Sequence, residues 1–366
     1  MVNETILAII IAFAISAALC PVVIPFLHRL KFGQQVRDDG PQSHLKKQGT
    51  PTMGGLIILT ATVITSLFYI KSYPRIIPIL FVTVGFGIIG FLDDYIKVFR
   101  KNKEGLNGRF KIIGQVGLGI IVGLVMWLSP QVVVKQKLDR HAPKAQVEYV
   151  NNNGARAAVY MGPAEKTTKT TIPFVKDNEF DYHWLIPGDS DGCDRAGWLV
   201  YVLVAIFVIT AVSNGANLTD GLDGLASGVS ATIVVILGIL AWLSGNVIYA
   251  DYLNIMYIPS SGELIVFAAA FAGALFGFLW YNCYPAQVFM GDTGSLAIGG
   301  IIAVFALLIR KELLLPLLCG IFLVEALSVL IQRGWFKYTK RKYGEGQRLL
   351  LMAPVHHHFQ KKGQFE

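Results

Sequence analysis

Residues 211–226 read AVSNGANLTDGLDGLA and lie between two long apolar stretches of the chain. The segment contains two carboxylates, Asp220 and Asp223, and no lysine or arginine. Ionisable groups beside membrane-spanning stretches are costly and usually serve a function. The apolar flanks therefore decide the fold, and the uncompensated carboxylates predict a polar site at one end of it.

The composition of the chain is that of a membrane protein. Of its 366 residues, 54% are hydrophobic and 15% are charged, and the mean hydropathy is +0.53. A soluble core of this length would bury far less apolar surface. Nine apolar runs of about 17 to 22 residues are long enough to cross the ~30 Å hydrocarbon layer as helices. They begin near Thr5, Met53, Arg75, Ile112, Trp198, Gly224, Glu263, Gly294 and Glu312. We predict an all-α, polytopic transmembrane helical bundle.

Basic residues predict the orientation of this bundle. They gather in three segments, at 29–47, 97–111 and 333–362. The positive-inside rule places these segments in the cytoplasm. With nine spans, the N-terminus is then external, and the first run is expected to remain in place because it lacks a positively charged leader. We predict a single catalytic domain, 1–366, with an extracytoplasmic insert at 130–195 that is too long for its own basic residues to decide its side.

Polar residues interrupt the apolar pattern at one predicted face, the cytoplasmic one. They lie at the end of the third span, before the sixth, between the seventh and eighth, and after the ninth. These residues are Asp93, Asp94, Asn217, Asp220, Asp223, Asn282, Asp292, His356, His357 and His358. Four segments that are distant in sequence are therefore expected to meet at one surface.

The residue types at this face suit metal-assisted phosphoryl transfer. Mg²⁺ prefers hard oxygen ligands, typically one or two carboxylates together with water and substrate phosphates. Lys47, Lys97 and Lys111 in the neighbouring basic segments can bind phosphate oxygens, and the glycines after Asp220 and before Asp292 allow backbone N–H groups to approach an anion. A bound metal ion would supply the positive charge that the 211–226 segment lacks.

Each motif also has a simpler structural interpretation. Paired aspartates beside basic residues are often a solvated helix end, and residues 217–225 could form a turn with an Asp N-cap. Asp292 before Thr293 could be an N-cap too, and the lysines could reflect the positive-inside rule alone. Three adjacent imidazoles cannot all face one site. The convergence of the motifs on one face nevertheless favours a functional site.

Five motifs together resemble a known family. They are PTMGG (51–55), GFLDDY (90–95), NLTDGLDGLA (217–226), NCYPAQVFMGDTGSLA (282–297) and APVHHHF (353–359). In this order they resemble the phospho-MurNAc-pentapeptide transferases of the polyprenyl-phosphate N-acetylhexosamine-1-phosphate transferase superfamily. The resemblance runs from about residue 30 to residue 362, apart from the insert. Family members usually carry a further apolar span after the histidine motif, so a tenth span is expected beyond the sequence given.

The resemblance implies a reaction and its site. Phospho-MurNAc-pentapeptide passes from UDP-MurNAc-pentapeptide to undecaprenyl phosphate at the cytoplasmic face of the bacterial inner membrane, giving lipid I and UMP, with Mg²⁺ as cofactor. It implies catalytic roles for Asp93, Asp94, Asp292 and His356, with Asp292 as the metal ligand. It implies substrate binding by Lys47, Lys97, Lys111, Asn217, Asp220, Asp223, Asn282, Phe289 and His357. Further implied partners are the lipid bilayer, the nucleoside inhibitors of the family and a second copy of the chain, and no nucleic acid is expected.

Two mechanisms and two rival functions stay open at this stage. Asp93 either attacks the β-phosphate to form a covalent intermediate, or assists direct attack by the acceptor phosphate. Phosphate monoesters have a second pKa near ~6, so the acceptor is mostly dianionic already and direct attack is favoured.

Among rival functions, transfer from a UDP-GlcNAc donor is the nearest, and the PTMGG motif and the three histidines argue against it. An ion-coupled transporter would place its carboxylates near the bilayer midplane, whereas here they lie at span ends.

Overall fold

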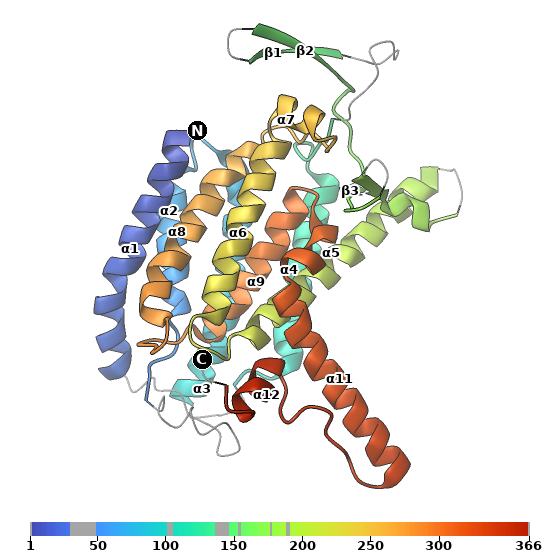
Figure 1. Ribbon diagram of the computed structural model, residues 1–366. Helices are drawn as coiled ribbons and strands as arrows, with labels where there is room; N and C mark the ends of the chain where they lie inside the picture. The colour runs from blue at the N-terminus through green and yellow to red at the C-terminus, as the bar shows by residue number, and fades with distance from the viewer. Residues whose placement is uncertain are drawn as a thin grey trace.

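The computed structural model describes residues 2–29, 49–100, 105–135, 146–152, 155–175, 178–187 and 191–364. Long helices form a bundle, which confirms the predicted all-α class (Figure 1). Each of the nine predicted apolar runs contains a helix. These helices are α1 (Val2–Arg29), α2 (Gly55–Tyr69), α3 (Ile77–Phe99), α4 (Gly108–Leu128), α5 (Asp191–Thr219), α6 (Leu225–Ser244), α8 (Leu264–Asn282), α9 (Gly291–Leu308) and α11 (Gly320–Tyr343).

Short helices join or end these elements. They are α7 (Val247–Tyr252), α10 (Leu315–Leu318), α12 (Val355–Lys361) and the 3₁₀ turns η2 (Pro74–Ile76), η4 (Tyr182–Leu185), η5 (Ser261–Glu263) and η6 (Glu312–Leu314). Among the described residues, seven helices are long and apolar enough to cross a membrane, and an eighth arises if η6–α10 and α11, which are bent by 79°, form one span. Helix α2 has only 15 residues. The chain is thus a multi-pass membrane protein, and nine crossings stays the prediction of the sequence.

Helices α8 and α9 form the centre of the bundle. Helix α9 packs against α3 and α5, and α8 packs against α1, α2 and α6. Every residue of α9 from Thr293 to Leu307 is buried. The outer helices α1, α3 and α4 instead expose many large apolar side chains, as expected for surfaces in contact with lipid. Because α9 is packed on all sides, the residues at its two ends are held in defined positions relative to the bundle.

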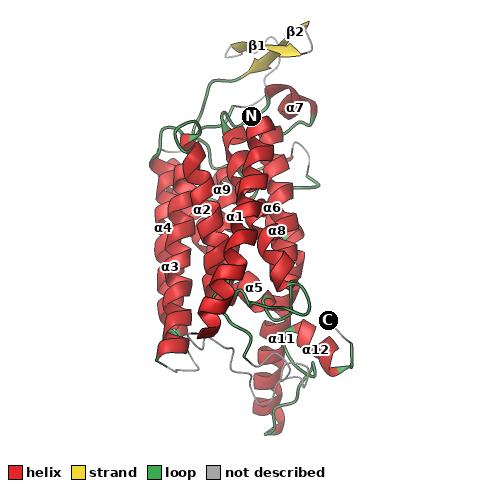
Figure 2. Ribbon diagram, turned by 90° about the vertical axis from the view of Figure 1, so that its left-hand side faces the viewer, coloured by secondary structure: helices red, strands yellow, loops and turns green. Residues whose placement is uncertain are grey.

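The two ends of the bundle carry different parts of the chain. The N-terminus lies at the same end as the strands of the insert, and α11 and α12 lie at the opposite end (Figures 1 and 2). The sequence likewise predicted that the N-terminus and the insert share one side. Assignment of the α12 end to the cytoplasm stays a prediction.

The segment between α4 and α5 is folded, which the sequence did not predict. Strands β1 (Gln146–Asn152) and β2 (Ala155–Met161) pair antiparallel, with Gln146 opposite Met161. Strands β3 (Lys169–Thr171) and β4 (Glu179–Asp181) form a second antiparallel pair. The hairpin of β1 and β2 projects away from the bundle (Figure 2), whereas β3 lies against it.

A buried charged group holds β3 at the C-terminal end of α9. It consists of Arg310, Lys311 and Glu312, each 1% exposed, and is here termed the insert-docking cluster. The backbone N–H of Thr171 donates to the Arg310 carbonyl over 3.0 Å, and the Lys311 ammonium donates to Thr171 Oγ1 over 2.6 Å. The Tyr182 hydroxyl donates to Glu312 Oε1 over 3.2 Å. The insert is therefore attached to the bundle at a defined position.

Candidate active site

The N-terminus of α9 is capped by carboxyl groups from α3 and from the turn between α5 and α6. The N–H and hydroxyl of Thr293 donate to Asp94 Oδ2 over 2.8 and 2.6 Å, and the N–H of Asp292 donates to Asp94 Oδ1 over 3.2 Å. The N–H of Gly291 donates to Asp220. The first N–H groups of a helix have no partner within the helix, and its dipole favours negative charge there. Asp94 and Asp220 supply acceptors for these N–H groups.

Close approach of α3 to α9 makes this cap possible. A Cβ added at Gly90, one turn before Asp94, would collide with the backbone of Asp292 and Thr293. The absence of a side chain at Gly90 lets the two helices touch, which brings the Asp94 carboxylate within reach of the α9 amides. A larger residue at position 90 would push the helices apart.

Because Asp94 occupies the cap, the side chain of Asp292 is free to face two lysines. Its Oδ2 lies 2.6 Å from Lys111 Nζ and 3.0 Å from Lys97 Nζ, and its Oδ1 accepts from Asn217 Nδ2 over 3.0 Å. The same two ammonium groups contact Asp93, Lys97 at 2.6 Å and Lys111 at 2.9 Å. Asp93, Asp94, Asp292, Lys97 and Lys111 together form what is here termed the carboxylate–lysine centre.

Asp93 is the most enclosed member of this centre. Its side chain is 0% exposed, and it also accepts a hydrogen bond from the Leu106 N–H over 2.7 Å. The side chains of Lys97, Lys111 and Asp292 are 33%, 17% and 15% exposed. The centre is therefore buried on the Asp93 side and open on the side of the lysines.

The three carboxylates can hold a metal ion. Asp93, Asp94 and Asp292 each offer one oxygen, and these oxygens lie within 4.8 Å of one another. Hard oxygen donors of this kind are what Mg²⁺ prefers. The lysines that contact them could turn to phosphate oxygens when an ion and a substrate bind.

A buried amide and hydroxyl network supports the centre, and sequence reasoning did not find it. Asn214 Nδ2 donates to Gln115 Oε1 over 2.8 Å, and Gln115 Nε2 donates to Ser213 Oγ over 3.3 Å. Ser213 Oγ donates to the Leu296 carbonyl over 2.9 Å. The network joins α4, α5 and α9, whose ends carry Lys111, Asn217 and Asp292. Its polar residues inside apolar runs were the available signal.

The turn between α5 and α6 brings further carboxyl groups close to the centre. Asp220 is half-buried, and burial, together with the charges of Asp292 and Asp94, raises its pKa to about 8. Asp223 Oδ2 accepts from the Ala286 N–H over 3.0 Å, which ties the turn to the loop after α8. The charged groups that raise the pKa of Asp220 are the carboxylates of Asp292, Asp94 and Asp223.

The loop after α8 is held by predicted site residues in structural roles. Asn282 Nδ2 donates to the Val288 carbonyl over 2.9 Å, and Asn282 Oδ1 accepts from Ser227 Oγ over 2.7 Å. The Phe289 N–H donates to the Pro51 carbonyl over 2.8 Å, and the Gly54 N–H donates to the Phe289 carbonyl over 2.9 Å. The PTMGG segment thus pairs with this loop. Substrate contact by Asn282 and Phe289 stays a prediction.

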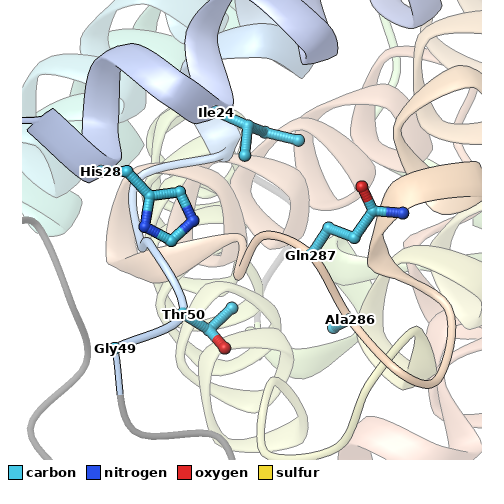
Figure 3. A pocket seen from close by; sticks show the side chains of 6 residues that line it. All are labelled: Ile24, His28, Gly49, Thr50, Ala286 and Gln287. Atoms are coloured by element: carbon cyan, nitrogen blue, oxygen red, sulfur yellow. The ribbon is translucent and has the colours of Figure 1, made fainter.

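A cavity of about 420 Å³ lies beside this loop, between it and the end of α1. His28 and Thr50 line it from one side and Gln287 from the other (Figure 3). Its lining includes none of the predicted site residues, but it includes Ala286, the amide partner of Asp223. The cavity therefore borders the site.

The three histidines face three different partners, as the sequence required. His356 is 5% exposed, and its Nδ1 lies 3.1 Å from Glu325 Oε2 on α11. His357 Nδ1 lies 2.9 Å from Gln360 Oε1, and His358 Nδ1 accepts from the Leu351 N–H over 3.1 Å. Glu325 was not predicted. Lys47, predicted to bind phosphate, lies outside the described residues.

Comparison with known proteins bears on this arrangement. The model of glycosyl transferase family 4 matches residues 76–310, and a phospho-N-acetylmuramoyl-pentapeptide-transferase signature matches residues 47–59. A phospho-N-acetylmuramoyl-pentapeptide-transferase from Parabacteroides distasonis is 57% identical over 98% of this chain and 83% of its own length. The chain belongs to the phospho-N-acetylmuramoyl-pentapeptide-transferase family. Relatives of the same name from Flavobacterium psychrophilum and Porphyromonas gingivalis are each 53% identical, over 98% and 97% of this chain and 87% and 83% of their own lengths.

The residues of this chain that the signature and the family model match include most of the predicted site. The signature covers the PTMGG segment, which pairs with the loop before Asp292. The matched range 76–310 contains the whole carboxylate–lysine centre and the turn with Asp220 and Asp223. The histidine motif lies outside this range.

Proposed function

We propose that this protein transfers phospho-MurNAc-pentapeptide from UDP-MurNAc-pentapeptide to undecaprenyl phosphate and releases lipid I and UMP. The observation that carries the proposal is the carboxylate–lysine centre, in which Asp93 and Asp292 share two lysines at the end of the bundle. The names of the relatives support the choice of donor. A donor diphosphate and an acceptor phosphate need such neutralisation, since several negative charges meet in the reaction.

Asp292 is the residue best placed to hold Mg²⁺, with Asp93 and Asp94 beside it. The ion, when bound, supplies charge neutralisation for the diphosphate. Lys97 and Lys111 contact both Asp93 and Asp292, so they stand where phosphate oxygens would arrive. Asp94 contributes by keeping the first turn of α9, and with it Asp292, in position.

The surroundings of Asp93 favour direct attack by the acceptor. In that mechanism an acceptor phosphate oxygen forms a bond to the β-phosphorus of the donor, and the bond from this phosphorus to the bridging oxygen breaks to release UMP. A covalent route would need Asp93 to act as the nucleophile. Two ammonium groups and the Leu106 N–H already bind its carboxylate, and its side chain is 0% exposed. Asp93 therefore orients the lysines.

The proposed orientation places this centre at the cytoplasmic face of the bacterial inner membrane, where UDP-linked donors are available. The predicted domain organisation follows from it, with one catalytic domain over 1–366 and the 130–195 insert outside the cell. Carboxylates at helix ends also fit an enzyme that acts on a water-soluble nucleotide better than an intramembrane ion pathway.

A direct assay tests the proposal. The purified, detergent-solubilised protein is incubated with UDP-MurNAc-pentapeptide, undecaprenyl phosphate and Mg²⁺, and release of UMP is measured. We expect release that requires both substrates and is abolished by EDTA and by Asp292→Ala. Release from UDP-GlcNAc alone would assign the protein to the neighbouring type of transferase, and no release from either donor would contradict the transferase assignment.

A further inference from the structure

A buried pair of ionisable side chains lies next to the site without touching its centre. Glu325 on α11 and His356 on α12 have side chains that are 5% and 4% exposed, and their Oε2 and Nδ1 atoms are 3.1 Å apart. Neither atom has a hydrogen-bond partner among the described residues that satisfies the usual angles. A buried carboxylate without a partner is strongly unfavourable, so each group depends on the other.

The second nitrogen of His356 faces the backbone of the α5–α6 turn. A Cβ added at Gly221 would collide with His356 Nε2 and lie 2.8 Å from Cε1. Nε2 is fully enclosed and has no polar partner among the described residues. The imidazole therefore packs on the turn that carries Asp220 and Asp223, and it presents no open edge to a ligand.

The other end of the pair is anchored to the bundle. Helix α11 packs against α5, and Phe322, one turn before Glu325, is 2% exposed and faces Gly215 on α5. The Gly221 N–H in turn donates to the Thr219 carbonyl at the end of α5 over 2.8 Å. Glu325, His356 and Gly221 thus form a continuous packed connection between α11 and the turn.

We propose that Glu325 and His356 are positioning residues that hold the α5–α6 turn, and with it Asp220 and Asp223, in place for the nucleotide-sugar donor. This proposal rests on the proposed function and changes the role of His356 from direct catalysis to support. Glu325 fixes the imidazole through Nδ1, and the imidazole fixes the turn by contact at Gly221.

The test combines steady-state kinetics with a steric complementation. We expect His356→Ala and Glu325→Gln to raise KM for UDP-MurNAc-pentapeptide about tenfold, the effect of losing one good interaction, while kcat changes less than about threefold. A change in KM with kcat retained marks lost binding rather than lost chemistry. Glu325→Gln should have no further effect in the His356→Ala background, because Glu325 acts through that imidazole.

Gly221→Ala supplies the steric test. In the wild-type background its methyl group collides with the fixed imidazole, so we expect a larger loss than for either other variant. In the His356→Ala background the collision is gone, and the double variant should match His356→Ala alone. A kcat about a thousandfold lower for His356→Ala, with KM unchanged, would overturn the proposal, because it would place the imidazole at the reacting atoms.

Two controls separate this inference from its premise. Glu312→Gln makes the same change at an equally buried glutamate at the far end of α9 and should leave KM unchanged. UMP affinity, measured calorimetrically for every variant, reports the state of the turn even where turnover is too slow to follow, and should weaken in parallel with KM. Wild-type protein that releases no UMP contradicts the proposed function, whereas active protein indifferent to Glu325→Gln contradicts this inference alone.

Discussion

The two ends of α9 both carry buried charges, yet they differ in how those charges are satisfied. At the N-terminal end, Asp93 and Asp292 share Lys97 and Lys111, and the lysines remain partly exposed. At the C-terminal end, each residue of the insert-docking cluster is 1% exposed, and the Arg310 guanidinium lies 4.7 Å from the Tyr201 ring centroid. Charged residues in a membrane protein are therefore no sufficient sign of a site. An opening to solvent and an excess of carboxylates over cations distinguish the end that carries the carboxylate–lysine centre.

The largest expected effect comes from Asp292→Asn at the N-terminal end. The change removes a negative charge that faces two lysines and could bind a metal ion, so we expect UMP release to fall about a thousandfold or more. The thermal midpoint should hardly change, since the α9 cap is made by Asp94. Steady-state kinetics beside Glu312→Gln measure this contrast. A similar loss of activity in both variants would contradict the proposed difference between the two ends of α9.

Arg310→Met at the C-terminal end should have the opposite profile. It removes one of the two cations that act on the buried Glu312 carboxylate, so we expect unfolding to be easier by about 3 kcal/mol. Activity per folded molecule should stay within about twofold of the wild type. Thermal unfolding in detergent and the UMP assay, performed on the same sample, separate the two quantities.

Lys111→Met and Lys311→Met compare a lysine at the N-terminal end of α9 with one at its C-terminal end. Loss of a charge-assisted contact to phosphate costs about 2 kcal/mol, or roughly 30-fold in kcat/KM. Lys311→Met, which removes an ammonium that donates to Thr171 Oγ1, should instead affect stability. Equal kcat/KM in wild type and Lys111→Met would show that Lys111 only neutralises carboxylates.

The effect of Asp220→Asn is confined to one range of pH. Because the folded state raises the pKa of Asp220 from 3.8 to about 8, the unfolded chain loses this proton at lower pH than the folded protein does. The carboxyl therefore destabilises the fold increasingly as pH rises through this window, and has no such effect below it. Without Mg²⁺, the variant should match the wild type near about pH 4 and unfold at a higher temperature near about pH 8. Equal midpoints at both values would contradict the raised pKa.

The sequence predicts the helices and the residues of the centre better than it predicts their roles. Apolar runs and the Asp93, Asp94 and Asp292 motifs are local signals, and the structure brings them together. The N-cap interpretation of Asp292 could not be decided locally, because Asp94, from a different helix, makes the cap. Glu325 was missed although it is a lone charge in an apolar run, which is a recognised signal. The strands of the insert were missed because their patterns are short: in β1 the alternation covers only residues 146–149, and β3 and β4 have three residues each.

The bond from Thr293 to Asp94 joins residues that are 199 positions apart, and this separation has a consequence for biosynthesis. At about 5 to 20 residues per second, the ribosome adds the second partner on the order of 10 to 40 s after the first. During that interval the inserting chain carries Asp93 and Asp94 without the α9 amides and without Asp292. A product that stops between residues 112 and 291 therefore has membrane helices but no complete centre: Asp93 keeps its two lysines, whereas the Asp94 carboxylate lacks the α9 amides that bind it in the full chain.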